Sequence, residues 1–159
     1  FGYDVHRFAD TPSNSHIRLG GIDIAHTHQL VGHSDADVAL HAVTDALLGA
    51  LAQGDIGSHF LPSDDAHKDR DSADFLTHAL SLADEAGARL THIDVTLICQ
   101  APKIEPHREA MRQRLSELLR LPVAAISVKA TTTEGLGFTG RGEGLAAQAV
   151  ATVLMPVAE

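Results

Sequence analysis

The stretch between Ser34 and Gly54 carries the clearest helical pattern in the chain. Ser34 is a residue type favoured at helix N-caps, Asp37 follows three residues later as in a capping box, and Gly54 is a typical stop signal. The apolar residues between them recur every three or four positions and define one face of a helix: Val38, Ala39, Ala42, Val43, Ala46 and Leu47. The pattern predicts a helix that packs this face against the rest of the fold.

The segments around this helix alternate between strand and helix patterns. Apolar residues that alternate or gather in short runs predict strands over residues 2–8, 17–25, 93–97 and 126–130. A second helix is predicted from Ser72, as its N-cap, to Glu85, and a third from near Pro106 to Leu119.

The end of the chain decides the fold class. Residues 131–144 contain five glycines and are predicted to form a loop. Residues 145–155 are rich in Ala and Val, and periodicity does not separate strand from helix there. A strand is predicted because the strand–helix order of the preceding segments needs a closing partner. The expected architecture is α+β, an α/β sandwich with helices packed on one face of a mixed β-sheet.

Composition narrows the class of protein. The chain has 159 residues, 44% of them hydrophobic, which suits a single domain over residues 1–159. A formal net charge of −9 argues against nucleic acid as a partner, and no apolar run reaches the roughly 20 residues of a membrane span. The single cysteine, Cys99, allows no internal disulfide and fits a reducing compartment, so a cytoplasmic location is expected. The start at Phe1, without a methionine, leaves room for a preceding segment or domain.

Asp4 and His6 form the first candidate metal site, in a chain unusually rich in histidine. Residues i and i+2 of a strand point to the same face, so a carboxylate and an imidazole converge, as in a catalytic zinc site. His33, Asp37 and His41 are spaced by four and share one stripe of the predicted helix, and His41 stands among apolar residues, where a polar group needs a partner. From the residues alone, a surface Asp–His pair and a hydrogen-bonded core histidine are as well supported as a zinc site.

Three further segments are candidates for phosphate binding. At the predicted helix start, residues 33–35 could use free N–H groups and partial positive charge, although Ser34 acting only as a cap is the simpler interpretation. The threonines of residues 131–133 precede a glycine-rich turn that could surround phosphate, with Glu134 holding Mg²⁺; a plain glycine-rich hairpin is the alternative. Lys103 could meet a phosphate or be an ordinary surface lysine.

These motifs, in this order, resemble the 2-C-methyl-D-erythritol 2,4-cyclodiphosphate synthases of non-mevalonate isoprenoid precursor biosynthesis. The resemblance spans essentially the whole chain. The matching stretches are YDVH at 3–6, HSDADVALHAVTDALLGA at 33–50, GDIG at 54–57, QAPK at 100–103 and KATTTEGLGFTGRGEG at 129–144.

The resemblance implies a metal-dependent lyase. The 2-phosphate of 4-diphosphocytidyl-2-C-methyl-D-erythritol 2-phosphate would attack the β-phosphorus, and CMP would leave. Thr132 would stabilise the transition state, with His33 as the second catalytic residue, and Glu134 would hold a second divalent ion, Mg²⁺ or Mn²⁺. The Zn²⁺ ion that orients the β-phosphate would be bound by Asp4, His6 and His41.

The same resemblance implies an extended substrate site. Residues 55–57 would line the erythritol pocket and residues 60–64 would form a flap over it. Residues 99–105 and 131–134 would hold the cytidine monophosphate part. The implied substrate-binding set is Asp4, Val5, His6, His33, Ser34, Asp55, Ile56, Gly57, Phe60, Leu61, Pro62, Ser63, Asp64, Cys99, Gln100, Ala101, Pro102, Lys103, Ile104, Glu105, Thr131, Thr132, Thr133, Glu134, Phe138 and Arg141.

Members of that family are homotrimers with active sites between subunits, and a fused or partner cytidylyltransferase is a further expectation. Two departures from the family pattern stand out: Pro62 replaces an acidic residue of the flap, and residues 69–71 are charged where the family is small and Gly-containing. Two alternatives stay open at this point. A zinc-dependent phosphohydrolase would release orthophosphate, and a non-catalytic trimeric metal-binding protein would have a closed four-ligand shell.

Overall fold

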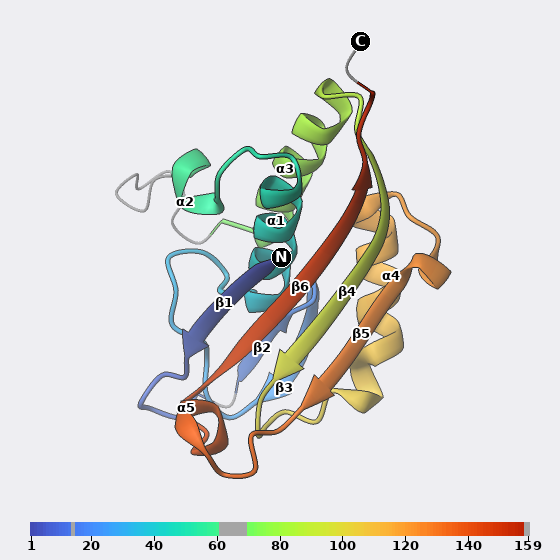
Figure 1. Cartoon of the computed structure of the whole chain (residues 1–159). Helices are drawn as coiled ribbons and strands as arrows, with labels where there is room; N and C mark the ends of the chain where they lie inside the picture. The colour runs from blue at the N-terminus through green and yellow to red at the C-terminus, as the bar shows by residue number, and fades with distance from the viewer. Residues whose placement is uncertain (14, 61–69, 158–159) are drawn as a thin grey trace.

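The computed structural model describes residues 1–13, 15–60 and 70–157 and consists of a sheet with helices on one face (Figure 1). The sheet has the strand order β1-β6-β4-β5, with β4 parallel to β5 and the other pairs antiparallel. Its strands are β1 (Gly2–Arg7), β4 (Arg89–Ile98), β5 (Ile126–Thr131) and β6 (Gly144–Leu154). The predicted α+β class and mixed sheet are confirmed, and so is the closing strand at the end of the chain.

Helices α1 (Val38–Ala50), α3 (Ser72–Glu85) and α4 (Arg108–Leu119) cover one face of the sheet, and its other face has no covering element among the described residues (Figure 1). Exposed apolar side chains occur on this second face, including Tyr3, Val5 and Val150. Within the described ranges, no helix combines the length and the apolar character that a membrane crossing requires.

Helix α1 and strand β1 approach each other unusually closely. Ala42 and Ala46, on the buried face of the helix, are fully buried. At Gly2 a Cβ atom would lie 2.0 Å from the carbonyl oxygen of Ala42 and 2.7 Å from the amide nitrogen of Ala46, so no side chain fits. Small residues on both elements therefore set the short distance between the strand and the helix.

The predicted strand over residues 17–25 is wrong, because two strands occupy this region. β2 (Ser15–Leu19) and β3 (Ile22–His26) form an antiparallel hairpin that is a separate two-stranded sheet. Its turn consists of Gly20 and Gly21, whose φ angles of 64° and 77° suit glycine. A Gly-Gly pair between apolar runs is a hairpin signal in its own right.

The predicted N-caps Ser34 and Ser72 are also wrong, although the second helix spans Ser72–Glu85 as predicted. The N-cap of α1 is Asp37, whose buried carboxylate accepts hydrogen bonds from the amides of Ala39 and Leu40 at 3.1 and 3.0 Å. The same carboxylate accepts bonds from the amides of the hairpin turn, Gly20 and Gly21, at 2.9 and 2.6 Å. Because one side chain satisfies donors in two elements, it determines where α1 begins.

The remaining predictions need smaller corrections. Asp71 is the N-cap of α3, and its carboxylate accepts from the amide of Ala73. Helix α1 ends at Ala50, before Gly54. The third helix begins as a short 3₁₀ turn, η2 (Glu105–His107), and another, η3 (Val123–Ala125), precedes β5. The predicted loop over residues 131–144 contains the short helix α5 (Gly137–Gly140), and α2 (Ile56–His59) follows α1.

Candidate metal centre and phosphate-binding segments

Three side chains from β1 and α1 converge on one point. Asp4 and His6 leave β1 on the face that packs against α1, as their spacing predicts, and His41 comes from α1. Asp4 Oδ2 lies 2.9 Å from His41 Nδ1 and 3.2 Å from His6 Nε2, and these two nitrogens are 3.2 Å apart. Within the described part of the chain, this is the one cluster of three such side chains whose ligand atoms converge.

In each histidine, the ring nitrogen that points away from the triad is hydrogen-bonded. The other ring nitrogen of each therefore faces the triangle formed by the three ligand atoms. His6 Nδ1 donates to the carbonyl oxygen of Val31 at 2.9 Å, which leaves a lone pair on Nε2. His41 Nε2 contacts the hydroxyl of Ser72 at 2.8 Å, which leaves Nδ1 facing the triangle. Two ring nitrogens and a carboxylate oxygen thus meet where a cation can be held. Their separations are close to the roughly 3.3 Å edge of a tetrahedral shell with bonds of about 2.0 Å.

Without a cation, the triad favours the ionised form of Asp4 and the protonated form of His6, so a bound cation takes the place of an imidazole proton. Burial would raise the pKa of Asp4, but hydrogen bonds from His41 and His6 outweigh burial and hold the pKa well below its ordinary value. For His6, burial would lower the pKa, yet hydrogen bonding and attraction to Asp4 leave the pKa raised. The ionised carboxylate provides the negative charge that a bound cation needs.

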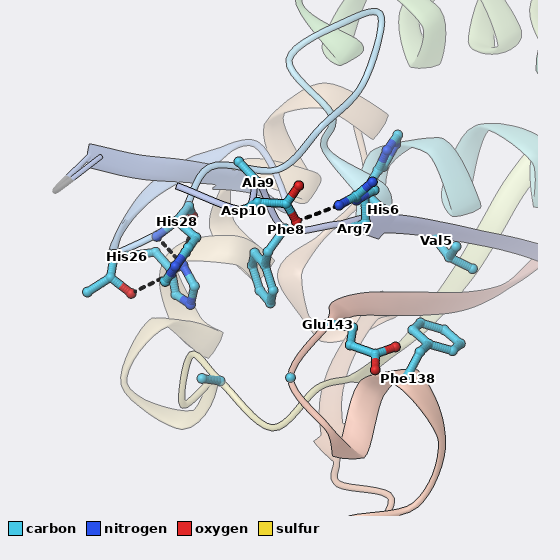
Figure 2. A pocket seen from close by; sticks show the side chains of 13 residues that line it. Val5, His6, Arg7, Phe8, Ala9, Asp10, His26, His28, Phe138 and Glu143 are labelled. Carbon is cyan, nitrogen blue, oxygen red and sulfur yellow. Dashed lines mark hydrogen bonds and ion pairs between the residues drawn. The ribbon is translucent and has the colours of Figure 1, made fainter. Parts of the chain in front are cut away.

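A cavity of about 730 Å³ opens beside His6 (Figure 2). The predicted residues Val5, Ala101 and Phe138 lie on its wall, together with residues that sequence reasoning missed. The missed residues include Phe8 and His26, whose rings stack with centroids 4.5 Å apart. The signal in the sequence was the pair of His26, which ends β3, and His28, which follows it with the same two-residue spacing as Asp4 and His6.

The predicted anion site at the start of α1 is not available as proposed. The helix begins after residues 33–35, and the amides of its first turn are already bound by Asp37. Ser34 nevertheless lies at the metal centre, with its hydroxyl oxygen 3.2 Å from His41 Nε2, and His33 is exposed. Neither His33 nor Asp37 shares the predicted helical stripe with His41.

The predicted phosphate segment after β5 is exposed and tightly turned. Thr132 Oγ1 donates to Glu134 Oε1 at 2.7 Å, and Glu134 has a positive φ of 52°. Thr133 Oγ1 bonds to the carbonyl of Leu136 and to Thr139. Hydroxyls and a carboxylate therefore gather in a loop that begins where Thr131 ends β5.

The triad and the start of this loop, at Thr131, lie at opposite edges of the sheet. One row of paired residues crosses all four strands through Val5, Ala146, Ile98 and Thr131. Three strand spacings of about 4.8 Å separate its ends by roughly 14 Å. Beyond Thr131 the loop runs to α5, which packs on β6 and has Phe138 on the cavity wall together with His6.

The other predicted substrate segments divide into buried and exposed parts. In residues 99–105, Cys99 and Ile104 are buried, and Lys103, Gln100 and Glu105 are exposed. The Ala101-Pro102 peptide bond is cis. Burial raises the pKa of the Cys99 thiol to about 11, so this cysteine is not a nucleophile at neutral pH.

The segment after α1 is anchored by two carboxylates. Asp55 caps α2 by accepting from the amide of Ser58 at 2.8 Å, and Asp45 of α1 accepts from the amide of Ile56 at 2.8 Å. Gly57 follows within α2, and the ring of Phe60 packs on Phe75. The predicted flap residues Leu61, Pro62, Ser63 and Asp64 lie outside the described residues. Arg141, predicted in the same site, is exposed and paired with Glu143 at 2.6 Å.

The fold and the triad define an α+β protein with a three-ligand site suited to a divalent cation. Residues 1–154 match the model of the YgbB family. The chain is 57% identical over 148 residues to the 2-C-methyl-D-erythritol 2,4-cyclodiphosphate synthase of Xanthomonas oryzae pv. oryzae, covering 93% of this chain and 89% of that protein. The chain therefore belongs to the YgbB family of 2-C-methyl-D-erythritol 2,4-cyclodiphosphate synthases, and the predicted resemblance is confirmed.

Two further similarities bear on the length and the ligand. The bifunctional enzyme IspD/IspF of Rhizorhabdus wittichii is 59% identical over 155 residues, covering 98% of this chain. The chain spans about two fifths (40%) of the length of that relative. The structure of IspF from Plasmodium falciparum in complex with CDP aligns with a TM-score of 0.83 and 31% identity, covering 99% of this chain and 94% of that one.

Proposed function

We propose that this chain converts 4-diphosphocytidyl-2-C-methyl-D-erythritol 2-phosphate to 2-C-methyl-D-erythritol 2,4-cyclodiphosphate and CMP, as a phosphorus-oxygen lyase of the cytoplasm. The observation that carries the proposal is the triangle of Asp4, His6 and His41, in which two ring nitrogens and an ionised carboxylate converge. The 57% identity to a protein with that name, over most of its length, supports the specific reaction.

The chemistry requires charge compensation more than acid–base catalysis. An oxygen of the 2-phosphate forms a bond to the β-phosphorus, the bond to the α-phosphate oxygen breaks, and CMP leaves with that electron pair. The attacking phosphate is already ionised at neutral pH, so no general base is needed. Attacker, target and leaving group are all anionic, and a protein with a net charge of −9 must supply local positive charge.

The residues of the chain divide this work between two segments. Asp4, His6 and His41 would hold Zn²⁺, which would offset the charge of the β-phosphate and orient it. Glu134 would hold Mg²⁺ or Mn²⁺, which would offset phosphate charge, and the hydroxyl of Thr132 would stabilise the transition state. His33, exposed near Ser34, would contact the substrate from the side of the triad.

We propose that the active site forms between copies in a homotrimer. The roughly 14 Å across the sheet from Val5 to Thr131 supports this, because it separates the triad from the end of β5, and residues 131–134 of a neighbouring copy could lie nearer the triad. The uncovered sheet face, with Tyr3, Val5 and Val150 exposed, is a suitable surface for such packing. Residues 99–105 would then bring the cytidine monophosphate part to the triad of the neighbouring copy.

The rest of the chain's organisation is also proposed. Residues 1–159 would form a single cyclodiphosphate synthase domain. The bifunctional relatives, of which the chain spans 40%, support a fused or partner cytidylyltransferase.

Analysis of the products tests the reaction. Incubation of the purified protein with the diphosphocytidyl substrate and both cations should release CMP and the cyclic diphosphate in equal amounts, with no orthophosphate. Release of orthophosphate would instead establish a phosphohydrolase. Crystals soaked with CDP and Zn²⁺ should show zinc on Asp4, His6 and His41, and zinc on other residues would refute the site.

Mixing of inactive copies tests the composite site. A His41→Ala copy keeps Glu134, and a Glu134→Gln copy keeps the triad. If sites form between copies, trimers co-assembled from equal amounts should have intact sites at about a quarter of the interfaces, hence about a quarter of normal activity. A site contained within one chain would give no recovery.

A further inference from the structure

The ring nitrogen of His41 that points away from the triad is surrounded by two hydroxyls. His41 Nε2 lies 2.8 Å from Ser72 Oγ and 3.2 Å from Ser34 Oγ. Ser72, the first residue of α3, is fully buried. A metal ligand on α1 is thereby joined to the start of a second helix.

The proton of the Ser72 hydroxyl is directed to Asp35, whose Oδ1 accepts it. Its other contacts with the described residues are also with donors or a cation. The amides of Asp37 and Ser72 donate to it, each at 3.2 Å, and Arg18 Nε lies 3.9 Å from Oδ2. Asp35 is therefore an acceptor only, and the Ser72 oxygen has its lone pairs free for His41.

This direction of hydrogen bonding fixes the tautomer of His41. Because Ser72 has one hydroxyl proton and gives it to Asp35, His41 Nε2 must carry a proton and donate it to Ser72. The opposite ring nitrogen, Nδ1, faces Asp4 and His6 and can give its lone pair to a cation bound between them. The same contacts prevent rotation of the ring away from the triangle.

The two histidines of the triad are anchored in different ways. His6 donates to the backbone carbonyl of Val31, a contact that no side-chain substitution at position 31 removes. His41 depends on the side chains of Ser72 and Asp35, 31 and 6 residues away in the sequence. Only the anchor of His41 can therefore be removed by mutation without touching a ligand.

We propose that Asp35 and Ser72 are positioning residues of the metal centre, which hold His41 in the tautomer and direction that binds the cation. The inference rests on the metal-dependent function proposed above and adds two residues to which that function assigns no part. Substitution of such hydrogen-bond partners typically lowers metal affinity about 10- to 100-fold.

Zinc affinity and a spectrum test the proposal on the full chain. Ser72→Ala should weaken Zn²⁺ binding about tenfold in competition with a chromophoric chelator. Loaded with Co²⁺, the variant should show an altered visible absorption spectrum, because the ring of His41 is no longer held. Thr44→Val is the matched control: Thr44 is buried on α1, but within the described parts of the chain its hydroxyl bonds only to the carbonyl of Leu40, at 2.8 Å. The control should keep the affinity and spectrum of the wild type.

A second variant keeps the test decisive if Ser72→Ala does not fold. Asp35→Asn places an amide NH₂ against the donors around Asp35, so it should weaken Zn²⁺ binding and alter the Co²⁺ spectrum in the same direction. Unchanged affinity and spectrum in the folded variants would overturn the positioning role. Failure of the wild type to bind Zn²⁺ would instead overturn the metal site itself, so the two failures are distinguishable.

Discussion

The two edges of the sheet differ in how many of their polar side chains already have partners within one chain. At the β1 edge, three ligand atoms converge, and two of the three ligands have a hydrogen-bond partner behind them. At the β5 edge, Thr132 and Glu134 are exposed and bond mainly to each other. One edge is fixed by packing within the chain, whereas the other offers polar groups that would gain their partners from substrate and a neighbouring copy. Substitutions at the two edges should therefore have different consequences.

The largest effect is expected at the β1 edge, from His41→Ala. Loss of one of three ligands should remove the cation and, with it, several kcal/mol of transition-state stabilisation. At 1.36 kcal/mol per tenfold, turnover should fall on the order of a thousandfold or more. The steady-state rate of CMP release measures this loss. A circular dichroism spectrum like that of the wild type would show that the fold persists, and a variant with undiminished turnover would refute the role of the triad.

The next effect concerns the support of this edge rather than its ligands. Asp37→Ala leaves four amides without their acceptor, in α1 and in the β2–β3 turn. The free energy of unfolding should fall by about 3 kcal/mol, measured by urea denaturation. Asp71→Ala is the control, since Asp71 caps α3 through one amide, and should cost about 1 kcal/mol. Equal losses in both variants would show that the bonds to the hairpin turn contribute nothing.

At the β5 edge, Glu134→Gln should act on turnover alone. The carboxylate is exposed, so the unfolding free energy and the Zn²⁺ affinity should stay at wild-type values. Turnover should fall about a hundredfold, equivalent to about 2.7 kcal/mol, because a charged ligand of the second cation is lost. Kinetics as a function of Mg²⁺ concentration check the cause: the variant should need more Mg²⁺ for half-maximal rate. Loss of Zn²⁺ binding in this variant would mean that the two edges are not separate.

The smallest effect is expected from the ion pair beside that edge. Lys129 Nζ lies 2.5 Å from Asp94 Oδ1, and this contact lowers the pKa of Asp94. The pair therefore stabilises the fold above the unfolded-state pKa of about 3.9, and this contribution is lost as the pH falls through the lower folded pKa. Both side chains are partly exposed, so Lys129→Met should cost less than about 1 kcal/mol. Urea denaturation at pH 6 and near pH 3 should show the difference shrinking at the lower pH.

Local patterns in the sequence predicted the parts of the site that depend on spacing within one element. The two-residue spacing of Asp4 and His6 placed both on one face of β1, and the apolar surroundings of His41 marked it as a residue that needs a partner. The helix, the closing strand and the mixed sheet followed from periodicity and order in the same way.

Contacts between distant segments could not be predicted. Asp37, not Ser34, starts α1 because its carboxylate also binds the amides of Gly20 and Gly21, which are brought near only by folding. The bonds from His41 to Ser72 and from Ser72 to Asp35 join residues 31 and 37 positions apart, and no pattern in either segment indicates them. The hairpin is different, since its Gly-Gly turn was visible in the sequence.

The geometry of the metal centre depends on Gly2, although glycine has no side chain that could bind a metal. A methyl group at this position would overlap the backbone of α1 and push β1 outward, and Asp4, two residues further along, would move with the strand. The lack of a side chain at position 2 therefore determines how far the donor atoms on the strand lie from the donor atom on the helix. Larger residues at position 2 should shift the preference of the centre toward cations with longer bonds before they prevent binding altogether.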